Sequence, residues 1–322
     1  SRDPDQEDLS DGLTDDIITA LSRYKDLFVI ARNSTFRYRG QAVDVRQLNK
    51  ELGARYVLEG SVQRAGDSLR VTAQLLDAKD GTHLWAETYD RELSASSIFA
   101  VQDEITERVV GTIASTHGVI SRVRFAEVKE KPTESLDACE SVLRANAYWR
   151  ANAIPPEHAR VRDALERAVE SDPGYADAWA WLSIIFMDEH RHNYNPRPAP
   201  LDRAMEAARR AVASDSTNQL AHCALAEAHF YRHDLDAFFA EAERAVALNP
   251  NDAVILAVMG EKFHFLGDER GITLLSRAMS LDPFHPTWFH IPIAIHHLKG
   301  GELEEALASA RKIDMPGFAP PQ

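Results

Sequence analysis

Cysteine is scarce in this sequence, with two residues in 322, so a disulfide framework is excluded as the basis of its stability. Cys139 and Cys223 each lie in a helix-like stretch and are expected to be small buried apolar residues. No apolar run approaches the roughly 18 to 20 residues that a membrane-spanning helix requires. HExxH and CxxC patterns are also missing, as is a glycine-rich phosphate loop opening a helix, so no familiar catalytic motif is present.

Basic residues are outnumbered, because 36 Lys and Arg face 50 Asp and Glu for a net charge of −14. Residues 1–131 contribute −4 of this charge and the remaining residues contribute −10. An acidic surface repels a phosphate backbone, so we expect no nucleic-acid partner for this chain. The apolar share of 44% and the charged share of 27% are ordinary for globular proteins, and the length indicates about two domains.

The first third of the sequence alternates between helical and strand-like periodicity, which predicts an α+β domain over residues 1–122. Its core would be a mixed sheet with helices packed on it. We expect helices at 11–24, 43–54 and 97–116 and strands at 27–32, 55–64, 68–78 and 82–92. Tight turns are expected at Gly66 and Gly81, between the last three strands.

Helical periodicity takes over in the second half and repeats with proline punctuation. Pro250, Pro283 and Pro316 recur every 33 residues. Small residues hold the matching place in successive second helices, namely Ala168, Ala211, Ala245 and Ala278. A period near 34 residues with this punctuation is typical of tetratricopeptide (TPR) helix pairs, so residues 135–322 are predicted to form an all-α TPR solenoid.

The helix pairs are expected at 135–173, 175–216, 217–250, 251–283 and 284–316. The polar stretch 123–134, which contains Pro132, is predicted to be the linker between the two domains. Three prolines in the segment 192–200 exclude a helix there, and we expect this insertion to project as a loop.

Three motifs of the first domain carry a family resemblance: RYVLEGSV at 55–62, HLWAE at 83–87 and QDEI at 102–105. With these motifs, residues 1–115 resemble the TolB-like amino-terminal domain, which is related to FlgO-type domains. The resemblance implies a bacterial signalling protein in which TPRs follow this domain and a class III adenylate or guanylate cyclase or a winged-helix domain precedes it. Members usually begin with an apolar strand that has no counterpart here, so we expect an open sheet edge.

The TPR resemblance also implies a peptide groove lined by residues of the first helix in each pair. Carried onto this sequence, the lining is Asp177, Ile184, Met187, Leu220, Glu227, Phe230, Glu261, His264, His290 and His297. This set is apolar with a few acids and histidines, which favours a hydrophobic or mildly basic peptide. Packing against another domain of the same protein is the alternative use of these residues.

Histidine is frequent, with 13 residues, and His229 and His233 stand four apart as two metal ligands on one helix face would. No third ligand accompanies them at a fixed spacing, so packing or surface histidines are the preferred interpretation. Neither a metal nor another cofactor is expected, and we expect no catalytic residues in this chain.

These features predict a non-catalytic protein- or peptide-binding module with a regulatory or scaffold role in a bacterial signalling protein, most simply an adenylate cyclase. One alternative is a structural envelope or flagellar assembly protein that pairs through its sheet edge, including as a homodimer. Another is the sensor part of a winged-helix transcription regulator. The expected partners are a protein or peptide and an upstream cyclase or DNA-binding domain, and the expected location is the cytoplasm, or the periplasm for the winged-helix alternative.

Overall fold

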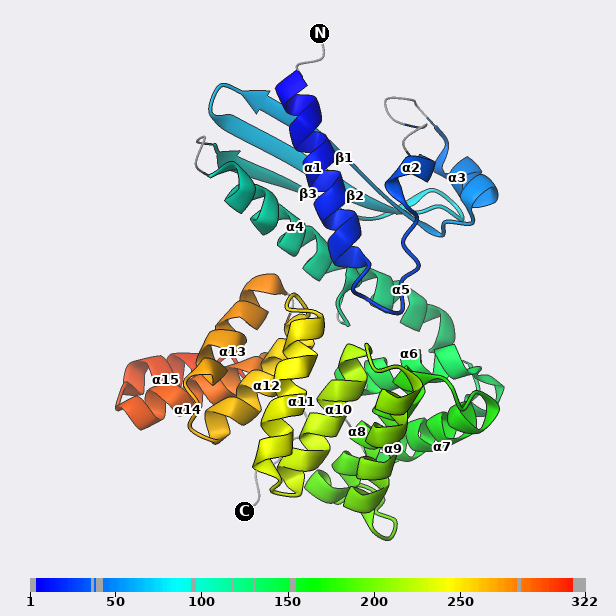
Figure 1. Ribbon diagram of the computed structural model, residues 1–322, viewed down its shortest axis with the longest axis vertical. Coiled ribbons are helices and arrows are strands. Elements are labelled where there is room, and N and C mark those ends of the chain that lie inside the picture. Colours follow the sequence, from blue (N-terminus) through cyan, green and yellow to red (C-terminus); the bar gives the residue numbers. More distant parts are fainter. Residues whose placement is uncertain are drawn as a thin grey trace. The chain divides into compact units, whose positions relative to one another are not determined.

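A computed structural model describes residues 4–35, 38, 43–93, 97–116, 118–129, 131–150, 155–282 and 285–314. The chain divides into two compact units, Ser1–Val119 and Ile120–Gln322, which are described separately (Figure 1). The division falls at the beginning of helix α5.

The first unit contains one small sheet and four helices within its described residues. The sheet consists of β1 (Tyr56–Ala65), β2 (Ser68–Asp77) and β3 (Thr82–Glu92), paired antiparallel in the order β1-β2-β3. Helix α1 (Pro4–Leu21) packs on α4 (Ile98–Ala114) and on β1. The shorter helices α2 (Arg32–Thr35) and α3 (Val45–Leu52) lie between α1 and the sheet in the sequence.

Alternation along the central strand explains how the sheet is covered. Leu69, Val71, Ala73 and Leu75 are at most 5% exposed, whereas Arg70 between them is exposed. One face of β2 therefore belongs to the core and the other is polar. The turns use glycines in the left-handed region, with φ of 62° at Gly66 and 83° at Gly81, as the sequence predicted.

Two expectations for the first unit are wrong. The described strands are all antiparallel, so the predicted mixed sheet is not seen among them. Residues 27–31 form no strand, and Phe28 is fully exposed. Their β-branched run has the propensity of a strand, but a strand also needs a hydrogen-bonded partner, which this segment does not have among the described residues. The α+β class is confirmed.

The second unit is a row of antiparallel helix pairs, and the predicted TPR-like solenoid is confirmed. The first helices of the pairs are α6 (Ala138–Arg150), α8 (Ala176–His192), α10 (Gln219–Tyr231), α12 (Ala253–Phe265) and α14 (His290–Gly300). The second helices are α7 (Pro155–Ser171), α9 (Pro200–Ser214), α11 (Leu235–Leu248), α13 (Arg270–Leu281) and α15 (Leu303–Ala310). Each first helix packs on the first helix of the next pair, which makes these helices one continuous layer (Figure 1).

Small residues set the spacing within the pairs. Ala168, Ala211, Ala245 and Ala278 are at most 3% exposed, as expected for residues at close helix contacts. The approach is close between α12 and α13, where a Cβ added to Gly271 would lie 2.5 Å from the backbone N of His264. Only glycine fits at that position.

Side-chain caps mark where several helices begin. The Asn218 side chain accepts a hydrogen bond from the N–H of Ala221 (2.8 Å) at the start of α10. Asp252 accepts from the N–H groups of Val254 (3.0 Å) and Ile255 (3.1 Å) at the start of α12. These caps satisfy backbone donors that a helix leaves unpaired at its N-terminus.

Much of the predicted linker 123–134 is ordered. Helix α5 (Val119–Val128) and the 3-10 turn η2 (Thr133–Ser135) occupy it. Arg144, which is 7% exposed, donates hydrogen bonds to the carbonyls of Val128 and Lys131, both at 2.8 Å, and so holds the end of α5 on α6. The expectation for Cys139 is wrong, because this residue is exposed, whereas Cys223 is buried.

Candidate functional site

The predicted groove residues fall into two groups by exposure. Ile184, Met187, Glu227 and His264 are at most 7% exposed, so they fill the packing between helices. The other members keep part of their surface accessible, namely Asp177, Leu220, Phe230, Glu261, His290 and His297. Without rearrangement a partner could reach mainly this second group.

Charged side chains connect three successive first helices, and we call Asp188, Arg191, Glu227, Glu261 and Lys262 the charge ladder. On α8, Arg191 lies 4.0 Å from Asp188 and 3.8 Å from Glu227 of α10. On α12, Lys262 lies 3.3 Å from Glu227 and also pairs with Glu261. The structure thus brings together two of the predicted residues, Glu227 and Glu261, through a lysine that is not among the predicted ones.

Burial and neighbouring charges act in opposite directions on the pKa values of Lys262 and Glu261 in the ladder. Burial alone would lower the pKa of Lys262, but the carboxylates of Glu261 and Glu227 raise it, so this lysine stays charged. Burial works against ionisation of Glu261 too, yet Lys262 and Arg191 lower the pKa of that carboxyl group. Asp188 is different, because burial raises its pKa above the ordinary value. The ladder therefore holds opposite charges of Lys262 and Glu261 in contact within the helix packing.

Aromatic rings flank the ladder on α10. The Arg191 guanidinium lies 5.7 Å from the ring centroid of Tyr231, and Lys262 Nζ lies 5.9 Å from that of Phe230. His190, which is exposed, lies 6.1 Å from Tyr231 between ring centroids. Partly exposed aromatic rings beside charged groups of both signs can contact an apolar peptide side chain and pair with a charged one.

The remaining predicted residues lie apart from the ladder. Asp177 accepts a hydrogen bond from Asn218 at 2.6 Å. Leu220 packs on two clusters of buried apolar side chains. His290 Nε2 lies 3.4 Å from Nε2 of His285, and His297 Nδ1 lies 2.5 Å from Glu302.

Histidines do not converge on a metal. His264 has ring contacts with His296 and Phe265, with centroids 5.5 Å and 6.3 Å away, and burial lowers the pKa of His264. His229 contacts Asp234 at 3.0 Å, and His233 lies in a turn with a φ of 60°. Over the described part of the chain, no three His, Cys, Asp or Glu side chains form a group that could hold a metal ion.

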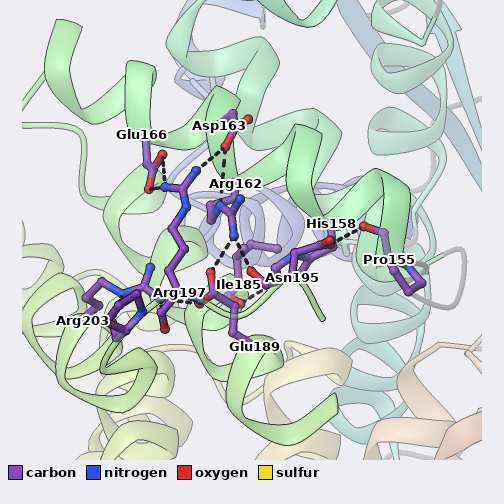
Figure 2. Close-up of polar contacts among 11 residues, drawn as sticks. Pro155, His158, Arg162, Asp163, Glu166, Ile185, Glu189, Asn195, Arg197 and Arg203 are labelled. Carbon is purple, nitrogen blue, oxygen red and sulfur yellow. Dashed lines mark hydrogen bonds and ion pairs between the residues drawn. The ribbon is translucent and has the colours of Figure 1, made fainter. Parts of the chain in front are cut away.

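A second polar cluster surrounds Glu189 near the end of α8 (Figure 2). Its carboxylate is fully buried, accepts a hydrogen bond from Arg162 of α7 at 3.0 Å and is paired with Arg203 of α9. The backbone N–H of Arg197 donates to the same carboxylate at 2.9 Å. Burial opposes ionisation of Glu189, but these three donors lower its pKa.

This cluster ties the insertion 192–200 to α7, while residues 195–199 stay exposed and non-helical. Arg197 donates to Glu166 at 2.8 Å and to Asp163 at 3.1 Å, both on α7 (Figure 2). The Asn195 carbonyl accepts from Arg162 at 2.8 Å, and its side chain donates to the Pro155 carbonyl at 2.6 Å. The prolines prevent a helix, as predicted, but long-range ion pairs fold the loop back onto α7.

Several residues that shape the site were missed from sequence. Tyr231 and Lys262 lie next to predicted positions and Arg191 lies one helical turn after Met187, but their roles depend on contacts between different helix pairs. Lys262 had one local signal, because Glu261-Lys262 interrupts an otherwise apolar helix, AVILAVMGEKFHF. A charge in such a stretch is buried and therefore needs a partner.

Taken together, the first helices present a layer with partly exposed aromatic and charged side chains, and no assembled reaction chemistry is seen among the described residues. In that part of the chain, no helix combines the length and the apolar character needed to cross a bilayer. The class of protein that the fold defines is a small α+β unit followed by a TPR-like solenoid.

Comparison with known proteins adds two relationships at the level of sequence. Residues 2–108 match the model of the HilA/YgeH-like transcriptional regulator family, second domain. The chain is 41% identical over 252 residues to a protein of Rhizobium meliloti (strain 1021) named "Putative adenylate cyclase 3". That match covers 76% of this chain and 40% of the relative, so the chain spans about two fifths of the relative's length.

Three solved structures each match between 52% and 60% of this chain. A thermophilic TPR protein of Thermus thermophilus, TTC0263, is 18% identical, with a TM-score of 0.45, over 56% of this chain and 91% of its own. MamA is 19% identical, with a TM-score of 0.36, over 52% and 91%. YrrB, described as a TPR protein with an unusual peptide-binding site, is 17% identical, with a TM-score of 0.34, over 60% and 91%.

Proposed function

We propose that this chain is a non-catalytic regulatory or scaffold module of a multidomain signalling protein with adenylate cyclase output. The observation that carries the proposal is the 41% identity to the Rhizobium meliloti protein named as a cyclase, across 76% of this chain. That relative is much longer than the matched region, because the match covers 40% of it. In this proposal the rest of the protein contains the cyclase, and the present chain controls it.

The control would come from binding a protein segment on the layer of first helices. Tyr231 and Phe230 offer partly exposed rings there, His190 offers an exposed one, and Glu261 offers a carboxylate that is 18% exposed. Residues 132–322 carry a net charge of −10, which favours a basic partner over an acidic one. We therefore propose an amphipathic segment with apolar and basic side chains as the ligand.

Regulation can be tested with a chimera. This chain would replace the matching region of the Rhizobium meliloti protein, and cyclic AMP formation would be measured with and without a basic amphipathic peptide. We expect the peptide to change the rate, since a ligand that binds one arrangement of the module more tightly shifts its population. A rate that stays the same when the peptide is bound would argue against regulation by this module.

Peptide binding is tested separately on the chain itself. Fluorescence polarisation would compare a labelled basic amphipathic peptide with its acidic counterpart. We expect Tyr231→Ala to weaken binding of the basic peptide about tenfold, which is typical for an aromatic contact residue. Leu235→Ala is the matched control, because Leu235 is 39% exposed on a second helix, α11. Equal affinities for the two variants would place binding elsewhere.

A second candidate function follows from the family model that matches residues 2–108. In that proposal the module senses a signal for a transcription regulator whose DNA-binding domain lies outside these residues. The TolB-like resemblance of the same region remains a prediction that fits either output. This candidate can be tested by joining the chain to a winged-helix domain and measuring reporter transcription with and without the peptide. A change in transcription on adding the peptide would favour this candidate over the cyclase.

A further inference from the structure

Among the described residues, the last helix pair exposes an apolar stripe that the other pairs do not. On α15, Leu303 is 67% exposed and Leu307 is 52% exposed, and Leu298 at the end of α14 is 59% exposed. Leu303, Leu307 and Ala310 follow the spacing i, i+4, i+7, so they share one side of the helix. Ala306 and Ser309, at 8% and 9% exposed, form the neighbouring side that packs on α14.

The preceding pair shows which side of a second helix packs within its own pair. Leu275 of α13 is 0% exposed and lies against α12, because its Cγ is 3.1 Å from a Cβ built at Gly260, and Ala278 is 0% exposed three residues later. On α15 the buried residues with this spacing are Ala306 and Ser309. Leu303 and Leu307 lie outside this packing and keep an exposed apolar surface.

Charges beside the stripe fit a second copy of the same helix. Glu304 and Arg311 are seven residues apart, so they lie on the same side of the stripe and about 10 Å apart along the axis. Arg311 has φ −66° and ψ −17°, so the helical path continues to it. If two copies pack antiparallel about a two-fold axis level with Leu307, Glu304 of each copy meets Arg311 of the other.

We propose that two copies of this chain associate through α15, with Leu303 and Leu307 in the centre and two Glu304–Arg311 ion pairs at the rim. A two-fold interface needs a surface that is complementary to itself, and Glu304 in the first turn of α15 and Arg311 at its C-cap supply this. Because α15 has only eight residues, the contact is small and the dimer is expected to be weak, with a dissociation constant of about 1–100 µM. This inference does not depend on peptide binding or on cyclase control.

Sedimentation equilibrium of the full chain over a range of concentrations tests the proposal. We expect a monomer–dimer equilibrium in the wild type and at least a tenfold weaker one in Leu307→Glu. Leu307 is exposed, so this substitution should leave the fold intact, which circular dichroism would verify. Leu235→Glu, at an exposed leucine of α11, is the matched control and should dimerise like the wild type. A chain that stays monomeric throughout would overturn the proposal and leave the stripe for another protein.

Charge reversal tests the antiparallel arrangement. Glu304→Lys alone and Arg311→Glu alone should each weaken dimerisation, because each places like charges together. The double variant should recover it to within about threefold, and a mixture of the two single variants should form a heterodimer more readily than either forms a homodimer. If the wild type dimerises and neither charge reversal weakens dimerisation, the antiparallel arrangement is wrong.

Discussion

Trp149 of α6 and Trp288 meet edge to face, with ring centroids 5.6 Å apart, although 139 residues separate them in the sequence. Trp288 lies in the 3-10 turn η3 (Thr287–Phe289) that leads into α14, so the ring pair joins the first and the last helix pair of the described solenoid. Trp149 also contacts Trp181 of α8, with centroids 6.4 Å apart. A peptide that followed all five first helices would have to displace this contact.

The tryptophan contact should be measurable as a coupling energy. Leucine at either position keeps apolar volume but removes the ring pair, so we expect each single variant to lose about 1–3 kcal/mol of unfolding free energy. In a double-mutant cycle, Trp149→Leu and Trp288→Leu should couple by about 0.5–1.5 kcal/mol. Urea denaturation of the four proteins supplies these values. Trp179, whose indole N–H donates to the Pro173 carbonyl at 2.9 Å, is the control, and Trp179→Leu should be additive with Trp288→Leu.

Gly271 should not tolerate a side chain. An alanine Cβ at Gly271 would lie 2.5 Å from the His264 backbone N and 2.6 Å from the Gly260 carbonyl oxygen. Backbone atoms cannot rotate away, so α12 and α13 would have to separate, at a cost of about 1–3 kcal/mol. We expect the melting temperature of Gly271→Ala to fall by about 2–4 °C for each kcal/mol.

Gly174 provides the comparison for that substitution. The nearest atom to a Cβ at Gly174 is a side-chain oxygen of Asp172, at 3.5 Å, which is ordinary contact. Gly174→Ala should therefore leave the melting temperature unchanged or raise it slightly. If both glycine variants melt alike, the close approach of α12 and α13 does not limit stability.

The charge ladder should be sensitive to removal of its central lysine. Lys262→Met removes the nearest cation from the buried Glu227 and the partly exposed Glu261 and leaves Arg191, 3.8 Å from Glu227, to balance them, which we expect to cost up to about 3–5 kcal/mol of unfolding free energy. Replacing Glu227 by methionine as well removes one of the stranded charges, so the double variant should be more stable than Lys262→Met alone. Chemical denaturation measures both. Lys299→Met, at an exposed end of α14, should change stability by less than about 0.5 kcal/mol.

Local patterns in the sequence were enough to locate most elements. The strands β1, β2 and β3 begin and end within one residue of their predicted bounds, because alternation and glycine turns are local signals. The helix pairs were located by periodicity and by small residues such as Ala211 and Ala245, which are buried as expected.

Contacts between distant residues account for what the sequence did not predict. Residues 27–31 look like a strand, but strand formation depends on a partner that local pattern does not specify. The fold-back of the insertion 192–200 depends on Arg197 reaching Glu166, 31 residues earlier. Likewise, Arg191 and Lys262 lie in different helix pairs and meet only through Glu227. The sequence indicates that a buried Lys262 needs an acidic partner. It does not indicate that Glu227 of another helix pair is that partner.

His192 should make the helical unit less stable in mild acid. Burial, followed by the charges of Arg191 and His158, lowers the pKa of His192 from 6.5 to about 4. Between these values the unfolded chain binds a proton that the folded chain does not, so unfolding free energy falls as the pH drops from about 6.5 towards 4. The loss should be on the order of 1–2 kcal/mol after allowing for the partial exposure of this side chain.

Replacing the imidazole should remove that part of the pH dependence. We expect the unfolding free energy of His192→Gln to decline less than that of the wild type between pH 6.5 and 4.5, when both are measured by urea denaturation at each pH. The carboxyl groups titrate in both proteins, so the difference between the two curves isolates His192. His233→Asn, in the exposed turn after α10, should follow the wild-type curve. Parallel curves for His192→Gln and the wild type would show that the protein does not keep His192 neutral.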